Sequence, residues 1–123
     1  MRLGGIDARA EVTVERVAPA LAMVDGRNGI GPLVGMRALE AAGEGARAAG
    51  IGAAFARGSN HFGPIMPYAL IAAEQGFASI IASNATTTIA PWGGKDTRLG
   101  NNPLGIGVPN LGGDQRIGHD RAE

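Results

Sequence analysis

Cysteine is absent from the 123-residue sequence, which excludes disulfide bonds, thiolate nucleophiles and cysteine-based metal sites and fits a reducing cytosol. Net charge is also absent, since 11 Lys and Arg balance 11 Asp and Glu, so nothing favours nucleic acid or an anionic membrane. No apolar run approaches the roughly 20 residues of a membrane span, and Met1–Gly5 lacks the layout of a secretion signal. We therefore expect a cytoplasmic protein that binds neither nucleic acid nor membrane. The two histidines are too few to build a metal site, so we expect no metal.

Aromatic residues are scarce at 4%, whereas glycine occurs 21 times. The core must therefore be built from small aliphatic side chains that pack closely. Such a composition is typical of strands and helices that alternate and are joined by tight turns. The length fits one domain or part of one.

Hydrophobic periodicity predicts an α/β pattern. Alternating valines over Glu11–Glu15 indicate a half-exposed edge strand. Two helices are expected at Leu33–Ala49 and Pro67–Gln75, stopped by Gly50 and Gly76 respectively. A buried strand is expected at Ala20–Val24. Strands of the same sheet are expected at Ile51–Ala56 and Phe77–Ala82, with a further short strand at Gly105–Pro109.

The first helix is predicted to be amphipathic, because its charged residues recur every three or four positions. Gly43 and Gly45 weaken this helix by about 1 kcal/mol each relative to Ala, which indicates close backbone packing. The polar face would hold Arg37, Glu40, Glu44 and Arg47, and the buried face Leu33, Met36, Leu39, Ala42, Ala46 and Ala49.

The segment from Asn110 to Glu123 has little hydrophobic periodicity. We expect residues 1–109 to form a partial domain and residues 110–123 to form a divergent, disordered tail.

His61 is the leading candidate for chemistry. It lies in the loop Ser59-Asn60-His61-Phe62-Gly63 between a predicted strand and a predicted helix, where α/β sheets display functional groups. Imidazole can take and return a proton near neutral pH, as the oxidation of an alcohol to a ketone requires. Taken alone, a loop histidine is more often a structural hydrogen-bonding group, so both interpretations stay open.

The glycines after the first buried strand invite a comparison with a dinucleotide fingerprint. Gly29 and Gly31 have the right spacing, but Val34 stands where the third glycine is expected. A tight structural turn, in which Gly and Asn adopt positive φ, is therefore favoured over a pyrophosphate cradle. Lys95 after Gly93-Gly94 lacks the pattern of a P-loop and is expected to be solvated.

Two polar segments are candidates for ligand contacts. Ser83–Thr88 follows the third strand and can meet a ribose or nicotinamide, although a plain polar turn is as good an interpretation. Asn102 either forms an Asx-type turn or aims its amide into a pocket, and it is our candidate substrate contact. A serine hydrolase is disfavoured because no G-x-S-x-G elbow is present.

Taken in order, these segments resemble the type-2 malate/L-lactate dehydrogenases, a family that includes ureidoglycolate and sulfolactate dehydrogenases and reductases of cyclic imino acids. The similarity extends from about Val17 to Pro109. It rests on Val24-Asp25-Gly26-Arg27-Asn28-Gly29-Ile30-Gly31, Ser59-Asn60-His61-Phe62-Gly63, Ala73-Glu74-Gln75-Gly76, Ser83-Asn84-Ala85, Ala90-Pro91-Trp92-Gly93-Gly94-Lys95 and Gly100-Asn101-Asn102-Pro103-Leu104.

The resemblance implies a non-Rossmann, mixed-sheet nicotinamide-dependent fold, here as a fragment, that acts as a homodimer or higher oligomer. It implies NAD or NADP as cofactor and a small 2-hydroxy or 2-oxo acid as substrate. His61 falls on the family's acid/base residue, and the cofactor contacts fall on Asn84 and Ala85. Ala85 offers only its backbone, whereas some relatives carry a serine there.

The sequence also departs from the family. The S-H-G-x-x-R motif, whose arginine binds the substrate carboxylate in relatives, and the long part that follows Pro109 have no counterpart here, and Pro32 replaces a common Gln. We therefore expect a truncated, weakly active dehydrogenase. The alternative is a non-catalytic remnant that folds or oligomerises without turnover.

Overall fold

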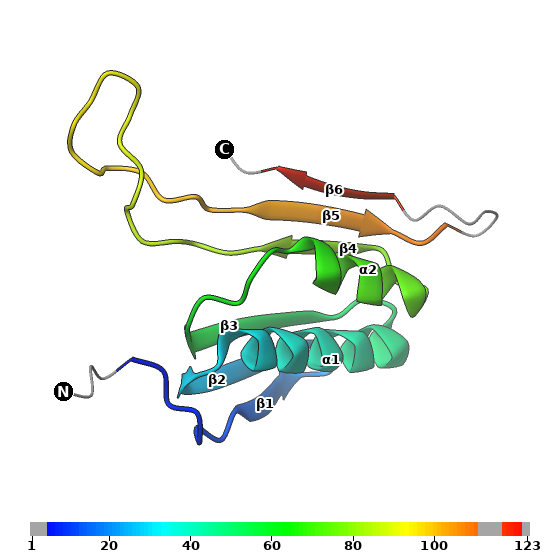
Figure 1. Cartoon of the computed structure of the whole chain (residues 1–123). Helices are drawn as coiled ribbons and strands as arrows, with labels where there is room; N and C mark the ends of the chain where they lie inside the picture. The colour runs from blue at the N-terminus through cyan, green and yellow to red at the C-terminus, as the bar shows by residue number, and fades with distance from the viewer. Residues whose placement is uncertain (1–4, 111–116, 122–123) are drawn as a thin grey trace. The chain divides into compact units, whose positions relative to one another are not determined.

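The computed structural model describes residues 5–110 and 117–121 (Figure 1). Strands and helices alternate along the first two thirds of the chain, which confirms the α/β class. The chain divides into two compact units, residues 1–64 and residues 65–123. Each unit has its own sheet, so each is described separately.

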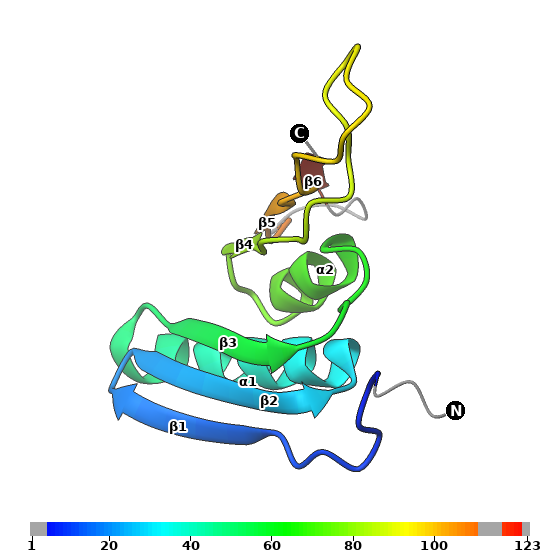
Figure 2. The ribbon, with the colours of Figure 1, turned by 90° about the vertical axis from the view of Figure 1, so that its left-hand side faces the viewer.

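The first unit is a three-stranded mixed sheet covered by one helix. It comprises β1 (Thr13–Ala18), β2 (Leu21–Gly29), α1 (Gly31–Ala49) and β3 (Ala53–Ser59) in the sheet order β1-β2-β3. The edge strand β1 runs antiparallel to β2, whereas β2 and β3 are parallel and are connected through α1. Figure 2 shows α1 lying along one face of this sheet. The predicted edge strand, first helix and mixed sheet are confirmed.

The ends of α1 follow the local sequence. Pro32 lies in the first turn, where a missing N–H costs nothing. Gly50 adopts a left-handed φ of 81°, and its N–H donates to the carbonyl oxygen of Ala46 at 2.9 Å. This ends the helix at the glycine that was predicted to stop it.

The predicted buried face of α1 is wrong. Leu33 is 45% exposed and Ala49 is exposed, whereas the buried residues are Gly31, Val34, Ala41 and Gly45. The helix lies so close to the residue that precedes β3 that a β-carbon on Gly45 would come within 3.3 Å of the Gly52 α-carbon. Close packing at Gly45 was predicted, and the small residues rather than the large ones form the contact face because they permit that approach.

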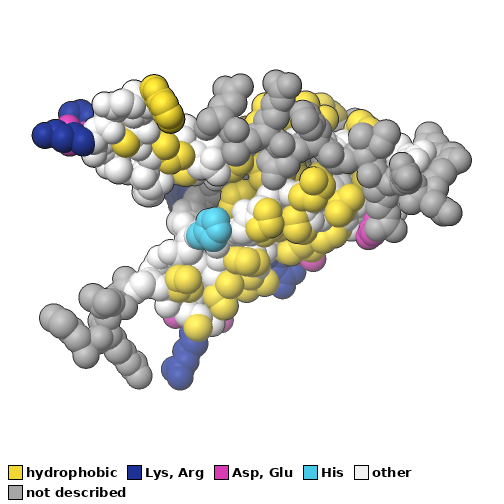
Figure 3. Space-filling view, turned by 45° about the horizontal axis from the view of Figure 1, so that its top comes forward, with side chains coloured by type: hydrophobic (Ala, Val, Ile, Leu, Met, Phe, Trp, Pro, Cys, Tyr) yellow, Lys and Arg dark blue, Asp and Glu magenta, His cyan; other side chains and the backbone are white. Residues whose placement is uncertain are grey.

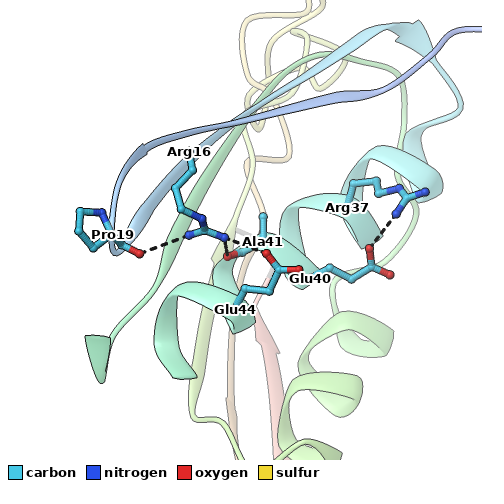
Figure 4. Close-up of polar contacts among 6 residues, drawn as sticks. All are labelled: Arg16, Pro19, Arg37, Glu40, Ala41 and Glu44. Carbon is cyan, nitrogen blue, oxygen red and sulfur yellow. Dashed lines mark hydrogen bonds and ion pairs between the residues drawn. The ribbon is translucent and has the colours of Figure 1, made fainter. Parts of the chain in front are cut away.

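Arg16 of β1 bridges the edge strand to the helix (Figure 4). Its guanidinium donates to the carbonyl oxygens of Pro19 and Ala41, both at 3.3 Å, and pairs with the Glu44 carboxylate at 2.9 Å. Arg37 and Glu40 form a second, exposed ion pair at 3.2 Å along α1. The charged face of the predicted amphipathic helix is thus used partly for bonding to β1.

The second unit contains α2 (Met66–Glu74) and a purely antiparallel sheet. The sheet order is β4-β5-β6, formed by β4 (Ser79–Ala82), β5 (Leu104–Val108) and β6 (Ile117–Arg121). Its buried apolar side chains include Ile65, Tyr68, Ala69 and Ala72. The predicted second helix and the short strand near Gly105–Pro109 are confirmed, and α2 is followed by Gly76 with a φ of 83°.

The prediction that Ala20–Val24, Ile51–Ala56 and Phe77–Ala82 belong to one sheet is wrong. β2 and β3 share the first sheet, but β4 pairs with β5 in the second. In this pairing Ile80 lies opposite Ile106 and Ala82 opposite Leu104. Apolar periodicity identifies a strand but not the strand with which it pairs. β4 pairs with β5, which follows the long loop of residues 83–103, and does not join β2 and β3.

The predicted tail is described only in part. Ile117–Arg121 forms β6, whose backbone pairs with β5, whereas residues 111–116 and 122–123 lie outside the described residues. The boundary at residue 110 stays a prediction.

Large apolar side chains reach the surface of both units, as the yellow side chains of Figure 3 illustrate. On the sheet of the first unit, Met23 and the neighbouring Phe55 are 37% and 62% exposed. On the sheet of the second unit, Ile80 and its partner Ile106 are 77% and 48% exposed. No helix in the described part of the chain is both long and apolar enough to cross a bilayer.

Candidate active site

His61 lies just beyond the carboxyl end of β3. Because β2 and β3 are parallel and Gly29 is in register with Ser59, the segments that follow both strands meet at one edge of the sheet. The imidazole is exposed and makes no hydrogen bond or ion pair with the residues that the structure describes. Among the described residues, no partner makes it a structural hydrogen-bonding group.

The backbone that carries His61 is anchored through the preceding residue. The Asn60 side-chain nitrogen donates to the carbonyl oxygen and the side-chain oxygen of Asn28, both at 3.0 Å, and to the Gly29 carbonyl oxygen at 2.9 Å. In addition, the Ser59 hydroxyl donates to the Asn60 carbonyl oxygen at 2.9 Å. The loop is thereby tied to the turn at the end of β2.

Gly31, the first residue of α1, packs directly against the same loop. A β-carbon built on Gly31 would overlap with the carbonyl oxygens of Asn60 and His61. Only glycine permits this approach of two backbones. The interpretation of the Gly29-x-Gly31 pattern as a structural turn agrees with this packing.

The last part of β2, where its register with β3 is irregular between Asp25 and Gly29, has an unusual conformation. Arg27 and Asn28 both have positive φ, 46° and 63° respectively, although neither is glycine. The Arg27 N–H donates to the Asp25 side-chain oxygen at 3.0 Å. Positive φ was predicted for the Asn and Gly residues of this segment. Asn28 confirms this, but the prediction is wrong for Gly26 and Gly29, which do not have positive φ, and Arg27 was not foreseen. Strained backbone of this kind is found where the surroundings hold it in place.

Asp25 and Arg57 form an ion pair that the sequence did not reveal. The Arg57 guanidinium donates twice to one Asp25 carboxylate oxygen, at 3.0 and 3.2 Å. The bond from the Arg27 N–H, opposed by desolvation and assisted by Arg57, lowers the pKa of Asp25 below its usual range. These two residues are neighbours in register on parallel strands. Their opposite charges were the only signal in the sequence, and that signal needs the register to be known.

The same pair borders a hollow of about 340 Å³ on the exposed face of the first sheet. Its lining is mixed, with four charged residues beside the apolar Met23 and Val24. The lining residues are Thr13, Glu15, Met23, Val24, Asp25, Arg27 and Arg57.

The remaining predicted site residues belong to the second unit. The Asn102 side-chain oxygen accepts a hydrogen bond from the Ala85 N–H at 2.8 Å, so these two residues are brought together. Asn84 is exposed, and its carbonyl oxygen accepts from the Ser83 hydroxyl at 3.0 Å. The Asn102 side chain therefore makes no hydrogen bond within an Asx-type turn, and its amide is only partly available to a ligand. It joins the two arms of the loop between β4 and β5, and its side-chain N–H groups face no acceptor among the described residues.

The described residues contain no cluster of three or more His, Asp or Glu side chains that could hold a metal ion. The first unit offers an exposed imidazole at His61, and the second unit offers exposed carboxamide and backbone groups around Asn84 and Asn102. These groups can exchange a proton and form hydrogen bonds with a polar ligand.

Comparison with known proteins identifies the class. The sequence pattern of the malate/L-lactate dehydrogenase family matches residues 1–122, and the chain belongs to this family of oxidoreductases. The malate dehydrogenase of Pyrococcus abyssi is 40% identical over 109 residues, which are 89% of this chain and 30% of the relative. The L-sulfolactate dehydrogenase of Methanocaldococcus jannaschii is 36% identical over 106 residues, 86% of this chain and 31% of the relative.

Solved structures agree with these relatives. The malate dehydrogenase from Pyrococcus horikoshii OT3 is similar with a TM-score of 0.85 and 38% identity, over 97% of this chain and 34% of that one. The chain thus spans about a third of the length of the relatives that it matches. The expected family, its mixed α/β fold and its oxidoreductase class are confirmed.

Proposed function

We propose that this chain forms part of an NAD- or NADP-dependent dehydrogenase that interconverts a malate-, L-lactate- or ureidoglycolate-like 2-hydroxy acid and its 2-oxo acid. The observation that supports this proposal is the exposed His61 imidazole at the carboxyl edge of a parallel strand pair, in a chain of the malate/L-lactate dehydrogenase family. In oxidation, His61 would accept the hydroxyl proton of the substrate. In reduction, it would return a proton to the carbonyl oxygen.

The loop between β4 and β5 offers groups that fit a nicotinamide cofactor. Asn84 presents an exposed carboxamide, and Asn102 retains side-chain N–H donors after accepting from Ala85. Because the Ala85 N–H is already bonded to Asn102, Ala85 would meet a cofactor through packing or its carbonyl group. When bound, the nicotinamide supplies hydride transfer to or from the carbinol carbon. We assign cofactor contacts to Asn84 and Ala85 and a substrate contact to Asn102.

The intact enzyme is expected to act as a homodimer. The exposed apolar residues on the two sheets, among them Phe55 and Ile80, support further association of this chain. No observation of the described residues favours the alternative of a remnant without turnover.

The test uses a chimera, because the chain spans about a third of its relatives. Residues 5–110 replace the matching segment of the Pyrococcus horikoshii malate dehydrogenase, and nicotinamide absorbance is followed across pH with malate and L-lactate. His61→Ala should lower kcat by about 10²- to 10⁴-fold and flatten its pH dependence, because one general acid/base contributes that much. Asn84→Ala should instead raise the KM of the cofactor.

Glu40→Gln is the matched control, since Glu40 lies in an exposed ion pair on α1 and contacts no site residue. It should keep the rate and pH profile of the chimera. A soluble, folded chimera without turnover would contradict the proposed activity. A His61→Ala chimera with a near-normal rate would contradict the role of His61.

A further inference from the structure

We propose that Asn60 is a positioning residue that fixes the backbone of His61 against the last two residues of β2, Asn28 and Gly29. This inference rests on the proposed function of His61 as the proton-transfer residue. It assigns to the neighbouring asparagine a role in holding, rather than in proton transfer. The geometry that supports it comes entirely from the first unit.

The side-chain nitrogen of Asn60 faces only hydrogen-bond acceptors. Its nitrogen lies 2.9–3.0 Å from three oxygens, the Asn28 carbonyl and side-chain oxygens and the Gly29 carbonyl oxygen. Two N–H groups serve these three oxygens, so one hydrogen is shared. A carboxylate of the same shape would place a negative oxygen against them, and a hydroxyl would supply one donor only. The site therefore requires a carboxamide at residue 60.

The acceptors themselves are held firmly. Asn28 is left-handed, and its carbonyl oxygen also accepts from the Asp7 N–H at 2.9 Å. Its side-chain nitrogen donates to the Gly5 carbonyl oxygen at 2.6 Å. Asn28 is thus also bonded to Gly5 and Asp7 of the N-terminal segment, so the acceptors of the Asn60 amide are themselves held in place.

Packing restrains the loop from another direction. The carbonyl groups of Asn60 and His61 pack so closely against Gly31 that a β-carbon would not fit between them. Hydrogen bonds from Asn60 and packing on Gly31 together restrain the peptide group that joins residues 60 and 61. Because the imidazole has no bond of its own among the described residues, its position depends on this restraint.

The consequence for catalysis is a matter of geometry. A displacement of about 1 Å in a reacting group can lower a rate by about 10²-fold. Loss of the Asn60 carboxamide should therefore reduce kcat by about this factor. The cofactor contacts are assigned to the other unit, so the KM of the cofactor should stay within twofold.

The first experiment needs no activity. In the chain itself, ¹⁵N relaxation and amide hydrogen exchange are measured at His61 and Phe62 for the wild type, Asn60→Ala and Asn60→Asp. Both variants should raise nanosecond motion at these amides, with Asn60→Asp at least as affected. Asn28→Gly is the matched variant. It keeps the left-handed backbone and both backbone acceptors, and it removes one of the three oxygens together with the side-chain bond to the Gly5 carbonyl oxygen. The bond from the Asp7 N–H to the residue 28 carbonyl oxygen remains, so this variant should keep most of the order. Unchanged order in Asn60→Ala would overturn the proposal.

The second experiment separates positioning from mere stability. In the chimera, Asn60→Ala is compared with Val24→Ala, which truncates a buried side chain of the same unit that is 1% exposed and not in the loop. Val24→Ala should lower the melting temperature and preserve kcat, whereas Asn60→Ala should lower kcat. Equal kcat values for the two variants would overturn the proposal. A high rate in His61→Ala would instead refute the proposed function and leave the relaxation result to decide the role of Asn60.

Discussion

The backbones of Gly31 and His61 approach so closely that a β-carbon on Gly31 would overlap with the His61 carbonyl oxygen. This contact joins the first residue of α1 to the loop that follows β3. The two residues are thirty positions apart in the sequence, yet the missing side chain of Gly31 allows the His61 loop to pack against the start of α1. The glycine pattern that resembles a nucleotide fingerprint has a packing role here.

The first prediction is that Gly31→Ala is strongly destabilising. Its β-carbon would overlap with two carbonyl oxygens that belong to backbone and cannot rotate away, so we expect a loss of about 3 kcal/mol in the free energy of unfolding. Gly45→Ala in the same helix is the control. Its nearest neighbours are 3.3 Å away, and a gain in helix propensity of about 1 kcal/mol offsets the small shift. Denaturant unfolding of both variants checks this, and equal losses would contradict it.

The second prediction concerns the face of α1. Val34 is fully buried, whereas the neighbouring Leu33 is 45% exposed. Val34→Ala should cost about 2 kcal/mol because it removes buried methyl groups and leaves a cavity, and Leu33→Ala should cost under about 1 kcal/mol although it removes more atoms. The two variants are compared by thermal and denaturant unfolding. A larger loss for Leu33→Ala would mean that the helix is rotated from the orientation described.

The third prediction is a pH dependence at Asp25. The Arg27 N–H and the Arg57 guanidinium lower the pKa of this carboxyl, so its charged form stabilises the folded state. A lowered pKa contributes stability above the ordinary value of about 4, and this contribution is lost as the pH falls through the folded value. Asp25→Asn should therefore lower the melting temperature at pH 7, and the difference should close in strong acid. A difference that does not depend on pH would show that Asp25 acts only through packing.

The fourth prediction concerns Tyr68, the single tyrosine of the chain. It is 6% exposed, and burial raises the pKa of its phenol. Its neutral form is thus favoured in the folded state, and the stability that this gives is present below about pH 10 and is lost as the pH rises through the folded value. Ultraviolet absorbance at alkaline pH should show ionisation later than for free tyrosine. In concentrated guanidinium chloride the midpoint should return to about 10. An ordinary midpoint in the folded chain would contradict the burial of this ring.

Local patterns predicted much of the fold. Gly50 and Gly76 both follow helices with positive φ, and alternating valines gave the edge strand β1. The pairing of β4 with β5 was not predictable, because the periodicity of Phe77–Ala82 is compatible with either sheet. The rotation of α1 was missed for a related reason. Counting large apolar residues favours Leu33, whereas the close approach of the helix to the sheet selects Gly31, Val34 and Gly45.

The same division applies to the candidate site. The motif around His61 was visible in the sequence, and so was its family. The hydrogen bond between Ala85 and Asn102 was not visible in the sequence, because the two residues are distant along the chain and no local pattern indicates that they pair. Asn60 stood inside the motif, but its role depends on the Asn28 and Gly29 carbonyl oxygens that face it only after folding.

By itself, the sequence determined the family, the identity and order of most helices and strands, and the candidate residue for proton transfer. These features are local, because they depend on spacing, on turn residues and on short motifs. The tertiary structure alone decided which strands pair, which face of α1 is buried, and which groups hold the His61 loop in place. Those outcomes depend on contacts between residues distant in sequence, where the energy comes from shape and from matched donors and acceptors.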